Sequence, residues 1–168
     1  MGGSLPTHPP HLLTIRAKSL ILGSLALQVL AIASREEPLT RAALLLSYPA
    51  LIAGCLMNFR TPGVALMLLG VVLNFVAILA NGGLMPVAVD HIGLSPVEGF
   101  VPGTKSVVLY AADIRLPLLT DRFSLPLSAL QGKVFSLGDA LIAAGLLVAG
   151  TRTLVGLVPH RSARDSHA

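Results

Sequence analysis

Hydrophobic positions along this 168-residue chain are gathered into four long runs that contain almost no charge. The runs cover residues 19–33, 41–59, 63–80 and 136–158. A helix needs roughly 20 mostly apolar residues to cross a bilayer core about 30 Å thick. The pattern therefore predicts an all-α integral membrane protein with four transmembrane helices, forming a single domain over residues 1–168.

The first run is the shortest, and basic residues stand on both sides of it. Arg16 and Lys18 precede it and Arg35 follows it, and the long stems of such side chains lengthen a short span by snorkelling. The same order of residues also imitates a cleavable signal peptide. We expect a retained helix, because the rest of the chain is itself apolar. Gln28, inside this run, is expected to form hydrogen bonds between helices.

The second and third runs contain or adjoin prolines and polar residues that bear on their helices. Pro49 lies in the middle of the second run and predicts a kink, since proline removes one backbone hydrogen bond. Thr61-Pro62 is expected to open the third run as N-cap and first-turn proline. Asn74 and Asn81 are seven residues apart and so share a helix face. They are expected to join helices, with a polar pocket as the alternative.

The segment of residues 81–134 between the third and fourth runs differs in character. It contains five prolines and four of the eight acidic residues, and a structureless loop of this length is rare unless it is functional. Residues 85–94 are expected to form a short helix on the membrane interface. Residues 107–114 are too short to span, which leaves a strand, a re-entrant segment or an interfacial piece. We expect a long extracytoplasmic segment that carries the specific function.

Composition narrows the classes of function. Charged residues make up 12% of the chain and hydrophobic residues 54%, whereas soluble domains have roughly 25% charged residues. The net charge of +4 comes from basic residues scattered singly at the ends of the runs, so nucleic-acid binding is excluded. A single cysteine, Cys55, rules out an internal disulfide. The pair His8 and His11 lacks a third ligand, so no metal or other cofactor is expected.

The basic residues also predict an orientation. Four spans place both ends of the chain on one membrane side, and the raw count of basic residues is six on each side. Four of those on the other side lie in the long segment 81–134, where they carry little weight in the positive-inside rule. Without those four, six basic residues on the side of the termini stand against two on the other side. This count favours cytoplasmic termini in a bacterial cytoplasmic membrane. The expected partners are the lipid bilayer and other membrane-protein subunits.

Asp139 is the acid closest to the interior of a predicted span. An ionisable residue at the mouth of a spanning helix is a functional candidate. However, Ser136-x-x-Asp139 also has the spacing of a helix-start capping box, and a carboxylate in a first turn offsets the helix dipole by about 0.3–1 kcal/mol. Capping alone is the simpler interpretation.

Catalysis by Asp139 requires a second carboxylate. Asp113, or Asp121 in its place, precedes Asp139 on the same predicted side of the membrane. Two adjacent carboxyl groups share one proton, so that one acts as a base toward water and the other polarises a carbonyl. The alternative hypothesis is therefore an aspartyl hydrolase at the membrane surface.

Several short motifs taken together resemble a known family. They are Asn74 in Leu73–Val87, Ala112-Asp113-Ile114, and Phe135-Ser136-Leu137-Gly138-Asp139. Their order is similar to that of an uncharacterised bacterial integral-membrane family, domain of unknown function 5317. The resemblance covers residues 73–150 and implies a membrane location without an activity. Family members tend to have a further apolar segment before the helix that bears the glutamine, and this chain departs from that pattern.

A more local similarity concerns the start of the fourth run. Residues 135–145 (FSLGDALIAAG) resemble the last motif of lipoprotein signal peptidases, in which an aspartate opens the fourth helix. The resemblance implies a catalytic role for Asp139, with Ser136 standing where that family prefers asparagine. The other aspartate motif of that family, Gly-Asn-x-x-Asp-Arg, is absent here. The sequence as a whole therefore predicts a structural or binding membrane component, with a membrane-embedded aspartyl peptidase as the alternative.

Overall fold

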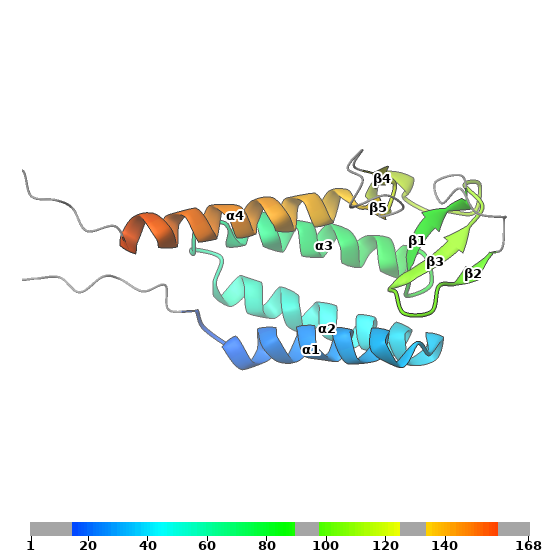
Figure 1. Ribbon diagram of the computed structural model, residues 1–168, viewed down its shortest axis with the longest axis horizontal. Coiled ribbons are helices and arrows are strands. Elements are labelled where there is room, and N and C mark those ends of the chain that lie inside the picture. Colours follow the sequence, from blue (N-terminus) through cyan, green and yellow to red (C-terminus); the bar gives the residue numbers. More distant parts are fainter. Residues whose placement is uncertain (1–14, 90–97, 125–133, 158–168) are drawn as a thin grey trace, which may run out of the picture.

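The computed structural model describes residues 15–89, 98–124 and 134–157, with side chains described to residue 152. Within these ranges the chain is mostly helical and has four helices (Figure 1). They are α1 (Lys18–Ser34), α2 (Glu37–Met57), α3 (Val64–Ala80) and α4 (Leu137–Leu157). The helix positions expected from the four hydrophobic runs agree with these bounds to within one turn.

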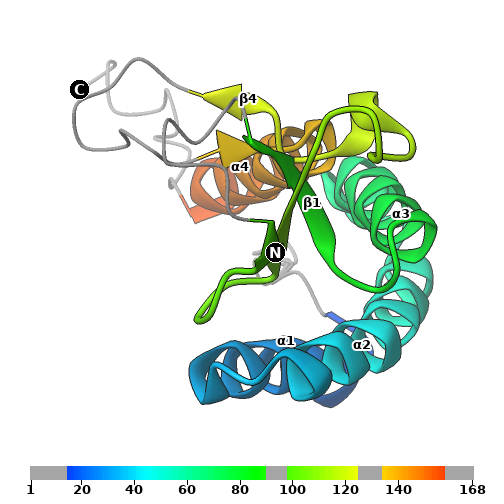
Figure 2. The ribbon, with the colours of Figure 1, turned by 90° about the vertical axis from the view of Figure 1, so that its right-hand side faces the viewer.

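The helices form an open arc in which each packs on its neighbour in the chain. Contacts join α1 to α2, α2 to α3 and α3 to α4. Viewed along the helices, α1 and α4 lie at the two ends of the arc (Figure 2). The start of α1 and the end of α4 lie at the same end of the molecule (Figure 1).

Paired glycines allow α3 and α4 to pack closely. A Cβ added to Gly138 would lie 2.5 Å from the carbonyl oxygen of Gly70, and one added to Gly145 would lie 2.5 Å from that of Gly63. Each helix thus contributes two glycines seven residues apart, and the antiparallel direction of the helices brings the two pairs together. The absence of a side chain at these glycines therefore permits the close packing of α3 on α4.

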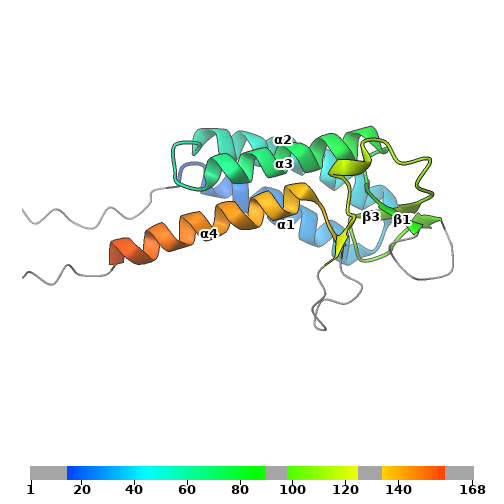
Figure 3. The same cartoon turned by 90° about the horizontal axis from the view of Figure 1, so that it is seen from above.

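A small β structure, here called the cap, covers the end where α3 finishes and α4 begins (Figure 3). Strand β1 (Met85–Ala88) pairs in parallel with β3 (Ser106–Leu109), which pairs antiparallel with β2 (Gly99–Phe100). The 3-10 helix η2 (Pro117–Leu119) follows, and β4 (Phe123–Ser124) pairs with β5 (Val134–Phe135) just before α4. Strand β1 is buried along its whole length.

The hydrophobic core lies where the helices meet the cap. Leu44, Tyr48, Ile78, Leu84 and Met85 belong to one buried cluster, so it joins α2, α3 and β1. The rings of Tyr48 and Phe75 stack with their centroids 5.5 Å apart. The cap is therefore packed on the helices and is not a separate domain.

Three local expectations need correction or narrowing. The short helix expected over residues 85–94 is wrong at its start, where β1 forms because β3 supplies a strand partner; residues 90–94 lie outside the described residues. The strand alternative for residues 107–114 holds for 107–109, which belong to β3. Thr61-Pro62 does not cap α3. Instead Gly63, with φ of 85°, occupies the N-cap position.

The length and hydropathy of the helices bear on the expected membrane spans. Among the described residues, α2 alone is both long enough and apolar enough to cross a bilayer. The apolar helices α1 and α3 have 17 residues each and are shorter than that test requires. Pro49 lies inside α2 without ending it.

Candidate functional site

Three charged side chains from separate parts of the chain meet between the cap and α4. The Lys105 ammonium lies 3.2 Å from Oδ2 of Asp139 and 3.9 Å from Oδ1 of Asp121. Lys105 immediately precedes β3, Asp121 follows η2, and Asp139 lies in the first turn of α4. Together they form what we call the charged cluster.

Strand β1 brings the two cap residues of the cluster together. The backbone oxygen of Lys105 accepts a hydrogen bond from the N–H of Met85, at the start of β1. The N–H of Asp121 donates to the oxygen of Pro86, and Asp121 forms an isolated parallel bridge with Val87. One buried strand thus fixes the backbone of both residues.

Asp139 is held by the start of α4. Its Oδ2 accepts a 3.3 Å hydrogen bond from the N–H of Ser136, and its own N–H donates to Ser136 Oγ over 3.0 Å. This reciprocal pair is a capping box, which satisfies two backbone N–H groups that the helix itself leaves free. The capping role expected for Ser136 and Asp139 is confirmed.

Asn74 links this capping box to α3. Its Nδ2 donates to Asp139 Oδ1 over 2.7 Å, and its Oδ1 accepts a 2.7 Å hydrogen bond from Ser136 Oγ. Asn74 and Ser136 are both buried. A buried amide that satisfies a carboxylate and a hydroxyl on another helix holds the two helices in one register. Asn74 therefore joins helices, which was the first of the two roles considered for it.

Asp121 is the most deeply buried member of the cluster. Its exposed fraction is 2%, and its Oδ1 has no hydrogen-bond partner among the described residues. Burial raises the pKa of Asp121 to about 6, against the lowering effect of Lys105 and with a further raising effect of Asp139. When Asp121 is protonated, the cluster contains one cation, Lys105, and one anion, Asp139, so its net charge is zero.

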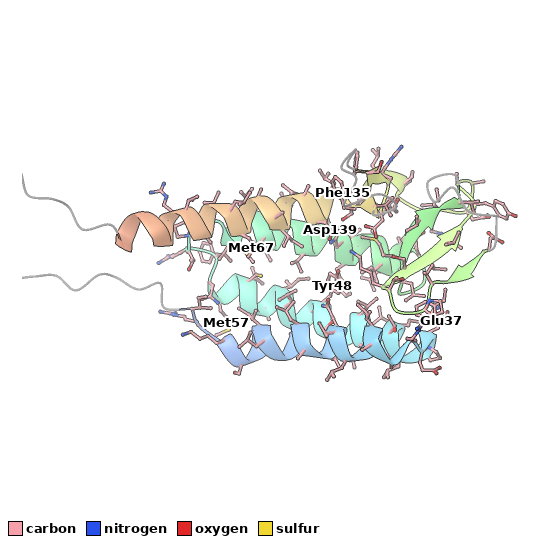
Figure 4. The ribbon with its side chains drawn as sticks, viewed as in Figure 1. Glu37, Tyr48, Met57, Met67, Phe135 and Asp139 are labelled. Carbon is pink, nitrogen blue, oxygen red and sulfur yellow. The ribbon has the colours of Figure 1, made fainter. Side chains whose placement is uncertain are left out.

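Lys105 remains charged in spite of its burial. Desolvation lowers the pKa of Lys105, but the nearby carboxylates of Asp121 and Asp139 raise it more, so that the pKa lies above its ordinary value. Tyr48 of α2 is close enough to interact electrostatically with the same three groups. Figure 4 shows Asp139 at the start of α4, above the level of Tyr48.

The other sequence candidates lie elsewhere. Asp113 is exposed in the turn after β3, so within the described ranges the carboxylate beside Asp139 is Asp121. Asn81 ends α3, and its side chain exchanges hydrogen bonds with the backbone of Arg115 in the cap. The buried Nε2 of Gln28 has no partner in the described part of the chain, and the expected interhelical hydrogen bond of Gln28 is not formed there.

Sequence reasoning missed Lys105 and Tyr48. In the sequence, Lys105 is one of four basic residues in the long segment 81–134, and Tyr48 is a lone aromatic beside Pro49. The available signal for Lys105 was its isolation: it is the single basic residue between Arg60 and Arg115, immediately before an apolar stretch. Such a lysine is either exposed in a turn or paired with buried acids.

A comparison with models of known protein families supports the family that the sequence motifs resemble. The model of a family of unknown function, DUF5317, matches residues 12–150. The chain belongs to this family. The match begins well before Leu73, so it includes α1 and α2 as well as α3. No curated protein and no solved structure matches the chain. The membership brings no established activity with it.

Proposed function

We propose that this DUF5317 member is an integral membrane protein whose four helices span the bacterial cytoplasmic membrane. The observation that carries the proposal is the outward direction of the large apolar side chains. Leu30, Leu46 and Leu147, on three different helices, have exposed fractions of 69%, 70% and 70%. Exposed large apolar side chains recur along all four helices, whereas apolar surface patches of more than a few hundred Å² are rare on monomeric soluble proteins.

The interior of the helical arc supports the same proposal, because much of it is small or polar. Ser24, Thr40, Ser47 and Asn74 are buried between helices. Thr40 Oγ1, near the start of α2, donates to the oxygen of Ala31 in α1 over 3.1 Å. Small residues and interhelical hydrogen bonds at contacts, with leucines facing outward, are typical of helices that pack in lipid.

The 17-residue helices are compatible with spans. At 1.5 Å per residue each is about 26 Å long, and arginines or lysines at the ends extend the reach into the headgroups. Arg16 and Lys18 stand at the start of α1 and Arg35 at its end. We therefore retain four spans in the proposal, with cytoplasmic termini and the cap outside.

Within this arrangement the charged cluster fastens the cap to the helices. Lys105 belongs to the cap and Asp139 to α4, so their ion pair crosses the boundary between the two parts. This geometry suits a structural or binding component that presents the cap at the outer membrane surface. Other membrane-protein subunits remain proposed partners.

Extraction and labelling test the proposed location. Membranes from cells expressing the full chain are washed with alkaline carbonate, and we expect the protein to stay in the pellet and to be released by detergent. Single cysteines at exposed positions Gly103 in the cap and Arg60 between α2 and α3, in a Cys55→Ser background, report the orientation. A membrane-impermeant maleimide on intact spheroplasts should label Gly103→Cys and not Arg60→Cys. Release into the carbonate supernatant would overturn the proposal.

A second candidate, the aspartyl hydrolase, is favoured by the approach of Asp121 to Asp139. The raised pKa of Asp121 also matches a carboxyl that shares a proton. Against this candidate, the Lys105 ammonium contacts both carboxyl groups, and Asp139 already accepts hydrogen bonds from Asn74 and Ser136. The variant Asp139→Asn distinguishes the two candidates. A hydrolase would lose measurable peptide cleavage at unchanged protein abundance, whereas loss of the attachment to Lys105 would loosen the cap.

A further inference from the structure

The helix end opposite the cap is basic. Every acid in the described residues lies at the cap end, in the cap itself or at the starts of α2 and α4. The described charged residues at the other end are all cations: Arg16, Lys18, Arg60 and Arg152.

Two of these cations line one pocket of about 400 Å³ at the junction of α1, α2 and α3. Arg16 lies on the side that leads into α1, and Arg60 lies in the turn between α2 and α3. Asn58 and Thr61 add polar groups, and Phe59 belongs to the apolar part of the lining. The pocket is therefore both cationic and partly apolar.

The backbone around this pocket is fixed by Asn58. The N–H of Arg16 donates to Asn58 Oδ1 over 2.6 Å, and Asn58 Nδ2 donates to the oxygens of Arg16 and Gly54 over 2.8 Å each. Asn58 is buried, with an exposed fraction of 5%. These hydrogen bonds use the main chain of Arg16, so its guanidinium remains available.

Both guanidinium groups are free of carboxylates. In the described part of the chain, neither Arg16 nor Arg60 forms a salt bridge. The guanidinium of Arg60 lies 5.6 Å from the centre of the Phe59 ring, which holds it beside the pocket. Two unpaired guanidinium groups offer planar donor pairs that match the oxygens of a phosphate.

We infer that the pocket between Arg16 and Arg60 binds the phosphate of an anionic phospholipid, with the apolar part of its lining against the upper acyl chains. The lipid as source rests on the proposed membrane location, in which this end faces the anionic cytoplasmic leaflet. Free phosphate has the same oxygen chemistry and is the alternative source.

The test uses the full chain purified in a neutral detergent. Phosphatidylglycerol or phosphatidylcholine is added to the micelles, and bound lipid is measured by native mass spectrometry. We expect phosphatidylglycerol to bind more tightly than phosphatidylcholine. Each cation near an anionic surface contributes about fivefold in affinity, so R16Q/R60Q should bind phosphatidylglycerol about 25-fold more weakly. The variant K18Q/R152Q, which removes two cations at the same end outside the pocket, is the charge-matched control and should change binding much less.

The possible outcomes separate the lipid from free phosphate. Displacement of phosphatidylglycerol by inorganic phosphate shows that the phosphate alone is recognised, whereas variant-sensitive binding without displacement shows that the lipid is required. Equal binding of both lipids, or equal losses in R16Q/R60Q and K18Q/R152Q, overturns the inference. If carbonate releases the chain from membranes, the membrane proposal fails independently of the pocket.

Titration of wild type and R16Q/R60Q with inorganic phosphate then tests whether the pocket binds phosphate. Equal phosphate binding by the two proteins, or no binding by either, overturns the inference.

Discussion

Lys105 and Asp139 form an ion pair of 3.2 Å that joins the cap to the first turn of α4. The two residues are 34 positions apart in sequence, and Asn74 on α3 holds the same carboxylate from another side. Asp139 thus has three roles. It forms the capping box of α4 with Ser136, it joins α4 to α3 through Asn74, and it attaches the cap through Lys105. A single carboxylate in these three roles makes the junction sensitive to small changes.

Removal of the Lys105 ammonium is expected to loosen the cap. Lys105→Met leaves two adjacent carboxyl groups without their cation, and we expect a loss of about 1–3 kcal/mol in the free energy of unfolding. Thermal unfolding in detergent measures the loss, and protease cleavage between residues 98 and 124 reports the cap. Arg115→Gln, which removes an exposed cation of the cap, is the control. Equal stability of Lys105→Met and this control would contradict the proposed attachment.

Asp121 makes stability depend on pH. Its pKa is raised from an unfolded value of 3.8 to about 6, so between these values the folded state binds more protons than the unfolded state. Stability is therefore expected to fall as pH rises from about 4 to 6, by an amount on the order of 3 kcal/mol from this residue.

Asp121→Asn tests this pH dependence directly. The amide cannot ionise, so the variant should be more stable than the wild type above pH 6 and should show a flatter profile between pH 4 and 6. Unfolding midpoints measured across that range give the comparison. Asp113→Asn is the matched control, since Asp113 is exposed. An unchanged pH profile in Asp121→Asn would show that this carboxyl does not titrate as described.

Close packing of α3 on α4 predicts different effects at two glycines of α4. Gly138→Ala places a Cβ 2.5 Å from the oxygen of Gly70 and should cost about 1–3 kcal/mol by forcing the helices apart. At Gly150 an added Cβ would meet no atom of the described residues within 4 Å. Gly150→Ala should therefore be neutral or stabilising by up to about 1 kcal/mol through helix propensity. Similar unfolding midpoints for the two variants would contradict the close crossing.

Asn74 is expected to be the polar residue whose loss most disturbs the helices. Asn74→Ala leaves the buried Ser136 hydroxyl and Asp139 Oδ1 each without one partner, at a cost of about 1–3 kcal/mol. Ser24→Ala is a suitable comparison, because in the described part of the chain the buried Ser24 hydroxyl donates to Leu20 of its own helix. Unfolding in detergent should show the larger loss for Asn74→Ala. The reverse order would contradict the linking role of Asn74.

The four helices could be placed from sequence because long apolar runs, bounded by charge or proline, leave few alternatives. The same holds for the capping box of Ser136 and Asp139, which depends on residues three positions apart. Strand β1 could not be placed in this way. Met85–Ala88 is short, contains a proline and becomes a strand only because Ser106–Leu109 lies beside it.

By itself the sequence determined which segments are helical, where Asp139 stands on its helix, and which small residues allow α4 to pack closely. These features depend on local spacing and on side-chain volume. Only the tertiary structure decided that Lys105 and Asp121, rather than Asp113, accompany Asp139, and that Arg16 and Arg60 line one pocket. Charges distant in sequence acquire partners through the path of the chain between them, and here β1 and the side chain of Asn58 fix that path.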